Sequence, residues 1–156
     1  FDVILCEPIN LKNQKKMKII KRGFKCFLKN PSILFNQNKH NIRLQFEMFH
    51  GYGNLDLAIN FLPDKDKSDF IEYVNNKTTL SPNCMYMSNN PELVEEFYKS
   101  LFIWLKKCES VFGFKNTNEY GTQRIYTFLT ERYLPFWFEK YSKVKYLPWL
   151  FYDLSK

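Results

Sequence analysis

The stretch 120-YGTQRIYTFLTERYLPFWF-138 decides the fold, because its rings and aliphatic side chains recur at helical spacing and predict a buried helix. We expect Pro135 to bend or end this helix. The same stretch carries four polar residues that either form the solvent-exposed face of the helix or line a site: Gln123, Arg124, Glu131 and Arg132.

Two of these residues suggest a specific chemistry. Arg124 and Glu131 are seven residues apart, so a continuous helix places them on one face, about 10 Å apart along its axis. Arginine offers a rigid fork to phosphate oxygens. A glutamate among rings is a candidate general base, since lost hydration raises its pKa. The alternative is structural, with both charges tied into an ion network between helices.

The composition is that of one globular domain. Of 156 residues, 45% are hydrophobic, 25% charged and 19% aromatic. The aromatic share predicts a core built on rings and allows a ring-lined groove. No run of about 18 apolar residues occurs, so we predict no transmembrane helix.

Positive charge is concentrated in one segment. Between Pro8 and Phe46 there is no acid and Lys and Arg contribute +10, so the rest of the chain carries 7 − 10 = −3. Within this segment, Met17–Leu28 predicts an amphipathic helix with a basic face and an apolar face. The basic face is either solvated or lies on an anionic membrane surface.

The rest of the chain predicts further helices and a few strands, and therefore a helix-rich α+β fold. Two separate strands cannot form a stable sheet, so we expect partner strands from sequence upstream of Phe1. The predicted elements are a strand at Phe1–Cys6, helices capped by Asn41 (to Phe49) and Asn90 (to Gly113), a helix at Asp64–Val74, a strand at Leu80–Ser88, and an extended run at Val144–Phe151 that Pro148 interrupts.

Several kinds of site are absent from the sequence. There is no P-loop and no GxGxxG, GxSxG or HExxH motif. His50 opens a glycine cluster, His50–Gly53, which is a turn between helices or a nest of N–H groups for an anion. No metal-ligand spacing occurs, and we expect free, buried thiols in a reducing cytoplasm at Cys6, Cys26, Cys84 and Cys108.

Three stretches occur in a recognisable order: QFEMFHGYGNLDLAINFLP at 45–63, LSPNCMYMS at 80–88, and the opening stretch at 120–138. A further segment, YKSLFIWLKKCE at 98–109, lies between the last two. Together they resemble a bacterial family of glycosyltransferases of capsule, exopolysaccharide and O-antigen synthesis, long labelled only as a domain of unknown function. The similarity covers the whole chain, although residues 12–39 are longer and more basic than the family pattern.

The resemblance implies that residues 1–156 are a single domain, the C-terminal, acceptor-side portion of a longer Rossmann-like, GT-A-type glycosyltransferase with few strands. It implies transfer of a sugar, such as galactose or galactofuranose, from a nucleotide-sugar donor to a saccharide or lipid-linked acceptor. Any divalent metal would be bound by an acidic motif upstream of residue 1, so no metal ligand is assigned in this chain.

The resemblance also implies a set of site residues, carried over position by position. Glu131 is the candidate base, or a carboxylate that orients the acceptor, and Arg124 or Arg132 is the phosphate partner. His50 lines the acceptor side and is a second catalytic candidate. The set is catalytic Glu131 and His50, with substrate-binding Asp56, Asn83, Gln123, Arg124 and Arg132.

The same resemblance implies a function for the basic helix. Acceptors of this class are lipid-linked, so Met17–Leu28 would hold a cytoplasmic enzyme on the inner face of the cytoplasmic membrane. The alternative function is a non-catalytic basic interaction module that binds an anionic membrane or nucleic acid. We expect no nucleic acid, because the aromatic residues follow core periodicity and do not alternate with Lys and Arg.

Overall fold

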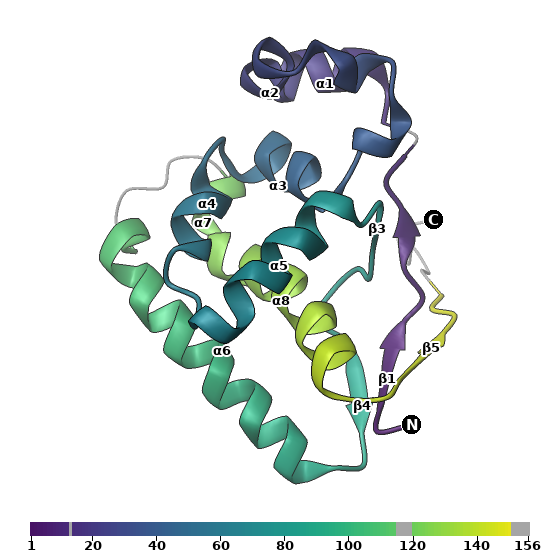
Figure 1. Cartoon of the computed structure of the whole chain (residues 1–156), viewed down its shortest axis with the longest axis vertical. Coiled ribbons are helices and arrows are strands. Elements are labelled where there is room, and N and C mark those ends of the chain that lie inside the picture. Colours follow the sequence, from purple (N-terminus) through teal and green to yellow (C-terminus); the bar gives the residue numbers. More distant parts are fainter. Residues whose placement is uncertain (13, 115–119, 151–156) are drawn as a thin grey trace, which may run out of the picture.

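The protein is a helix-rich α+β structure, which confirms the predicted fold class. The computed structural model describes residues 1–12, 14–114 and 120–150. Figure 1 shows the strands β1 and β5 along one side of the molecule, the long helix α6 toward the other, and α1 and α2 at one end. The α-helices are α1 (Lys16–Arg22), α2 (Phe24–Lys29), α3 (Ile42–His50), α4 (Asn54–Ile59), α5 (Asp64–Asn76), α6 (Pro91–Phe112), α7 (Tyr120–Gln123) and α8 (Ile125–Tyr141). The short 3-10 helices are η1 (Pro31–Leu34) and η2 (Gln37–Lys39), and the strands are β1 (Val3–Cys6), β2 (Ile9–Asn10), β3 (Thr79–Leu80), β4 (Tyr86–Ser88) and β5 (Val144–Leu147).

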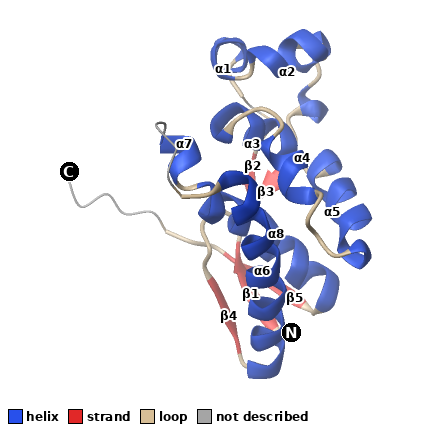
Figure 2. Ribbon diagram, turned by 90° about the vertical axis from the view of Figure 1, so that its left-hand side faces the viewer, coloured by secondary structure: helices blue, strands red, loops and turns tan. Residues whose placement is uncertain are grey.

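A three-stranded mixed sheet is built around β1, in the order β4-β1-β5 (Figure 2). Val3 lies opposite Ser88 in the antiparallel pair with β4 and opposite Val144 in the parallel pair with β5. Val3 and Leu5 are buried, as expected for alternate positions on the covered face of a strand. The strands β2 and β3 form a separate antiparallel pair. The described strands thus find partners within this chain, while the expectation of further partner strands upstream of Phe1 stays a prediction.

Helix α8 runs through the centre of the core. Every residue from Arg132 to Phe138 is buried, and the helix packs against α3, α5 and α6. Pro135 neither ends nor interrupts the helix, contrary to one of the two predicted outcomes, since α8 continues to Tyr141. An interior proline costs roughly 3 kcal/mol. Burial of the aromatic rings around it, among them Tyr133 and Phe136, offsets that cost.

The predicted single helix over 120–138 is wrong near its start. α7 ends at Gln123, and Arg124, with φ −109° and ψ 26°, separates it from α8. The N–H of Phe128 still donates to the carbonyl of Arg124 (3.1 Å), so helical spacing resumes immediately. A periodic pattern therefore does not reveal the break.

Two capping asparagines begin the helices that were predicted from them. The Asn41 side chain accepts a hydrogen bond from Leu44 N (2.9 Å), and the Asn90 side chain accepts one from Leu93 N (3.0 Å). Along α6, a stripe of the predicted apolar face is fully buried, and the Trp104 indole donates to the carbonyl of Ala58 (2.8 Å). The buried stripe comprises Phe97, Leu101, Trp104 and Cys108.

The predicted helix Met17–Leu28 is two helices, α1 and α2, separated at Gly23. A Cβ atom at Gly23 would lie 2.9 Å from both the Ile19 carbonyl oxygen and Met48 Cγ, so glycine permits this close approach to α3. Because the break reorients α2, one helical wheel does not describe both helices. Met17, Phe24 and Leu28 belong to the apolar face predicted for a single helix, and all three are exposed.

The strand predicted over Leu80–Ser88 is instead two short strands, β3 and β4, with a turn between them at which Asn83 has φ 64°. The four cysteines are free, as predicted, but the thiol predicted to be buried at Cys84 is exposed. Phe151, the predicted end of the last extended run, lies outside the described residues. Among the described helices, none has both the length and the apolar character needed to cross a membrane.

Candidate functional site

Arg132, on α8, is a buried charge held by several partners. Its side chain is 1% exposed, which is rare for an arginine without compensating contacts. Nη1 donates to Glu131 Oε2 (2.6 Å) and to the Phe128 carbonyl (3.0 Å), and Nη2 donates to Gln45 Oε1 (2.5 Å). Burial lowers the pKa of Arg132 to about 10, and the charge of Glu131 opposes that shift. Within the described part of the chain, the buried Nε makes no hydrogen bond.

His50, at the end of α3, lies beside this guanidinium. Its Nε2 is 3.4 Å from Nη2 of Arg132, and the ring is 5% exposed. The ring stacks on Phe128, with centroids 3.8 Å apart and planes at 20°, and it meets the edge of Phe46 at 4.9 Å. The structure thus brings together three predicted site residues. We call Gln45, His50, Phe128, Glu131 and Arg132 the Arg132 cluster.

Glu131 is the part of the Arg132 cluster with the most evident chemical use. Its side chain is 20% exposed, whereas that of Arg132 is 1% exposed. One carboxylate oxygen is fixed by the guanidinium, and solvent reaches the group. A carboxylate held in this way can accept a hydrogen bond or a proton from a bound hydroxyl group. Glu131 and Arg132 are neighbours on α8, so this ion pair lies within one helix and differs from the predicted alternative, a network between helices with Arg124.

Arg124 is the N-cap of α8, one position before the helix that carries Glu131, so the predicted placement of both residues on one helical face stays a prediction. Arg124 is exposed, and its guanidinium carbon lies 5.7 Å from the ring centroid of Phe128. Phe128 is therefore a shared neighbour of Arg124 and His50. Gln123 is exposed at the end of α7, a short helix that packs against α3.

Asn83 is exposed in the turn between β3 and β4, but its neighbour Cys84 lies close enough to the Arg132 cluster to sense its charges. The pKa of the Cys84 thiol is raised to about 11, mainly by lost hydration and then by the charge of Glu131, while the charge of Arg132 opposes the shift. The turn between β3 and β4 therefore lies near the Arg132 cluster, as the effect of Glu131 and Arg132 on the pKa of Cys84 indicates.

Asp56 belongs to a different site. On α4 it forms an ion pair with Arg43 of α3, and the pair lies at a polar pocket of about 400 Å³. Glu47, also lining this pocket, is 8% exposed. Burial raises the pKa of Glu47 above 4.5, while the hydrogen bond from Cys26 and the charge of Arg43 lower it. The sequence interpretation missed Arg43 and Glu47, although their spacing of four residues on a predicted helix was a signal for paired charges.

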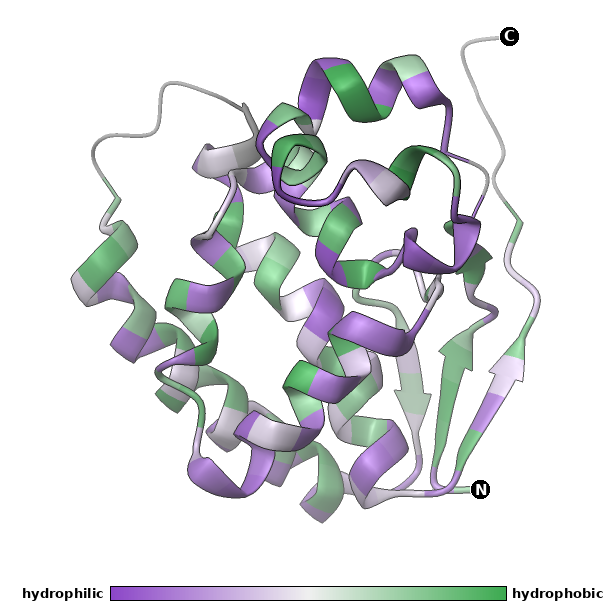
Figure 3. Cartoon of the chain, turned by 45° about the horizontal axis from the view of Figure 1, so that its top comes forward, coloured by the Kyte–Doolittle hydropathy of each residue, from purple (hydrophilic) through white to green (hydrophobic). Residues whose placement is uncertain are grey.

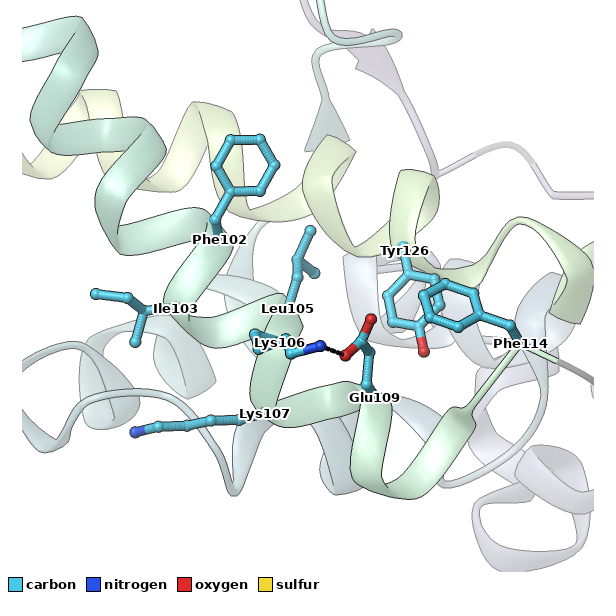
Figure 4. A pocket seen from close by; sticks show the side chains of 8 residues that line it. All are labelled: Phe102, Ile103, Leu105, Lys106, Lys107, Glu109, Phe114 and Tyr126. Atoms are coloured by element: carbon cyan, nitrogen blue, oxygen red, sulfur yellow. Dashed lines mark hydrogen bonds and ion pairs between the residues drawn. The ribbon is translucent and has the colours of Figure 1, made fainter.

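An apolar cavity of about 770 Å³ lies along the C-terminal half of α6 (Figure 4). Glu109 in this cavity is engaged by Lys106, and the Tyr126 hydroxyl donates to the Gly113 carbonyl (2.9 Å). No predicted site residue is among those that line it, so this cavity does not add to the Arg132 cluster. Its lining residues are Phe102, Ile103, Leu105, Lys106, Lys107, Glu109, Phe114 and Tyr126.

Over residues 1–12, 14–114 and 120–150, no three His, Cys, Asp or Glu side chains come together as a metal-binding group.

Fold and site together define a helix-rich α+β domain with a buried arginine, a half-buried glutamate and a histidine clustered between α3 and α8. Residues 7–143 match the family described as Domain of unknown function (DUF4422), and the chain belongs to that family. The search of curated proteins gives no match, and neither does the search of solved structures.

Proposed function

We propose that this chain is the acceptor-side part of a glycosyltransferase of bacterial surface polysaccharide synthesis. It moves a sugar, such as galactose or galactofuranose, from a nucleotide-sugar donor to a saccharide or lipid-linked acceptor. One observation carries the proposal: the first and third of the stretches that carry the family resemblance meet at Arg132. The first stretch supplies Gln45 and His50, and the third supplies Glu131. In the second stretch, Cys84 lies near enough for the charges of Glu131 and Arg132 to shift the pKa of its thiol.

In this proposal, Glu131 accepts the proton of the acceptor hydroxyl as that oxygen bonds to the anomeric carbon of the donor sugar. The bond between the anomeric carbon and the oxygen of the nucleoside diphosphate breaks, and the nucleoside diphosphate leaves with the electron pair. Arg132 is a positioning residue, since its 1% exposure keeps it from substrate while it fixes one oxygen of Glu131. The exposed Arg124 is the cation that contacts the diphosphate.

We also propose that the domain is of the Rossmann-like GT-A type. The parallel pairing of β1 with β5 supports this, because parallel strands require a crossover connection and the helices of this chain provide one. An experimental structure of the full protein tests the assignment. A larger, mostly parallel sheet that includes β1 supports it, whereas a sheet limited to β4-β1-β5 argues against it.

Replacement of Glu131 in the full native protein tests the function. Wild-type protein, Glu131→Gln and the control Glu96→Gln, an exposed position on α6, are incubated with UDP-galactose or UDP-galactofuranose and a lipid extract of the native host. Transfer is measured as sugar label entering the acceptor fraction. We expect Glu131→Gln to lose about 10²–10⁴ in turnover, the usual contribution of a general base, and Glu96→Gln to match wild type. Normal turnover by Glu131→Gln with an unchanged unfolding transition would remove Glu131 from the mechanism.

A further inference from the structure

The helices α1 and α2 are attached to the rest of the protein along one side only. Ile19 is buried in a small cluster with Met48 of α3, and Cys26 and Phe27 pack against the same cluster. Gly23 permits the close approach of α1 and α2 to Met48 on α3. Lys18 and Arg22 lie over the ring of Phe49 on α3 but stay exposed, and α1 and α2 form one end of the molecule (Figure 1).

The outward side of α1 and α2 is strongly cationic. No acid occurs between Pro8 and Phe46, so no negative charge from this segment lies among the cations. Within the described residues, none of the exposed cations of α1, of α2 or just before α1 forms an ion pair with a carboxylate. These exposed cations are Lys15, Lys16, Lys18, Lys21, Arg22, Lys25 and Lys29.

Large apolar side chains are exposed among the same cations. Met17 is 61% exposed, Phe24 53%, Leu28 62% and Phe35, directly after η1, 79%. Phe24 and Leu28 are four residues apart on α2 and share a face, and Lys16 lies 5.1 Å from the ring centroid of Phe35. Figure 3, which brings this end forward, shows hydrophilic and hydrophobic segments alternating along both helices. We call these four apolar residues and seven cations the α1–α2 surface.

We propose that the α1–α2 surface docks on an anionic lipid bilayer. Cations without acidic partners match the negative headgroups, while Met17, Phe24, Leu28 and Phe35 enter the boundary between headgroups and acyl chains. A nucleic acid fits less well, because the aliphatic side chain of Leu28 and the thioether of Met17 have no ring face on which a base can stack. The exposure of these apolar side chains is an observation of the structure that the charge pattern of the sequence does not contain. The proposal does not depend on the chemistry of Glu131.

Vesicle binding by this chain tests the proposal. The chain is mixed with vesicles of phosphatidylcholine, with or without phosphatidylglycerol, and the bound fraction is measured by flotation. The first variant, Lys15→Gln/Lys21→Gln/Lys25→Gln, lowers the net charge from +7 to +4 at side chains without described contacts. The control, Lys107→Gln/Lys143→Gln/Lys145→Gln, makes the same change at exposed positions on α6, before β5 and on β5. The second variant, Phe24→Ser/Leu28→Ser, removes apolar side chains and leaves the charge unchanged.

We expect binding only to the phosphatidylglycerol vesicles. Each surface lysine contributes about fivefold to the partition coefficient, so the first variant should bind about 100-fold more weakly. The second variant should bind at least about tenfold more weakly, because two apolar side chains no longer enter the bilayer. The control should stay within about twofold of wild type, since charges beyond a Debye length of about 8 Å are screened at physiological salt.

Three results would overturn the proposal. The first is equal binding to both kinds of vesicle, and the second is an equal loss in the control and in the first variant. The third is no vesicle binding together with oligonucleotide binding that the first variant loses and Phe24→Ser/Leu28→Ser retains, which would assign the surface to nucleic acid. Circular dichroism of each variant shows that the fold is retained, and the exposure of every substituted side chain makes that outcome expected.

Discussion

The guanidinium group of Arg132 on α8 donates a hydrogen bond to the side-chain oxygen of Gln45 on α3, although the two residues are 87 positions apart in the chain. This bond joins the first and the last of the three stretches that carry the family resemblance. It also offsets part of the free-energy cost of burying the guanidinium charge. The contact is therefore both a constraint on how α3 crosses α8 and the frame within which Glu131 is held.

Replacing Arg132 should destabilise the protein strongly. Arg132→Met keeps most of the side-chain volume but leaves the Phe128 carbonyl and Gln45 Oε1 without their donor. We expect a loss of about 3 kcal/mol in the free energy of unfolding, in the range found when one partner of a buried pair is removed. Urea denaturation measures it. The control Arg22→Met, at an exposed position on α1, should change stability by less than about 1 kcal/mol. Similar losses in the two variants would contradict the assigned role of Arg132.

The glycines after His50 should respond differently to the same substitution. Gly51 has φ +96° and Gly53 has φ +83°, so alanine is strained at both positions. At Gly51, a Cβ atom would also lie 2.4 Å from Nδ2 of Asn54, which donates to the His50 carbonyl (2.7 Å). At Gly53, no atom lies within 4 Å of the added Cβ. Gly53→Ala should cost about 1 kcal/mol, and Gly51→Ala about 2–3 kcal/mol because it also displaces Asn54. Equal unfolding midpoints in urea for the two variants would refute this difference.

Glu47 should make stability depend on pH in a defined direction. Its folded pKa is above the ordinary value of 4.5, mainly because of burial. The folded state therefore holds this proton more tightly than the unfolded state. The stability that follows is fully present below pH 4.5 and is lost as pH rises through the folded pKa. At pH 7 the folded protein carries the cost of a buried carboxylate.

Glu47→Gln removes that cost, so it should raise the urea midpoint at pH 7 and have little effect near pH 4. The measurement is a urea midpoint series across this pH range for wild type and variant. Glu72→Gln, at an exposed position on α5, is the matched control and should give a difference from wild type that stays flat with pH. A benefit of Glu47→Gln that grows as the pH falls would show that the sign is wrong.

Local signals in the sequence predicted much of the secondary structure. The capping asparagines Asn41 and Asn90 satisfy backbone N–H groups wherever they occur, so the starts of α3 and α6 could be read directly. The buried stripe of α6 could be predicted for a similar reason, because helical periodicity is local. The boundary at Arg124 could not, since the apolar spacing continues across it.

Tertiary contacts could not be predicted from capping residues and helical periodicity, because these signals are local. The exposure of Phe24 depends on which side of α1 and α2 packs against α3, and that choice rests on Gly23 and Met48. The pairing of β1 with β4 and β5 joins segments more than eighty residues apart, for which a single sequence holds no local cue. Glu131, Arg132 and His50 could be named from the sequence, and the family resemblance assigned them site roles. Their mutual contact, through Gln45, required the fold.

The reactivity of Cys84 should report on Glu131. The thiol is exposed, but its pKa is about 11, because of lost hydration and then the charge of Glu131. At pH 8 it should therefore react with iodoacetamide more slowly than an ordinary thiol, whose pKa is about 8.5. Glu131→Gln removes a charge that raises the pKa, while the charge of Arg132, which lowers it, stays in place. The thiolate fraction therefore increases, so alkylation of Cys84 should become a few times faster.

The measurement is the rate of alkylation of the Cys84 peptide by mass spectrometry, and the control is Glu96→Gln on α6. The control should leave the rate unchanged. An equal rate in wild type and Glu131→Gln would mean that the turn at Asn83 does not reach the charges of α8. The second of the three family stretches would then lie apart from the Arg132 cluster, and the proposed transferase site would include only the first and the third.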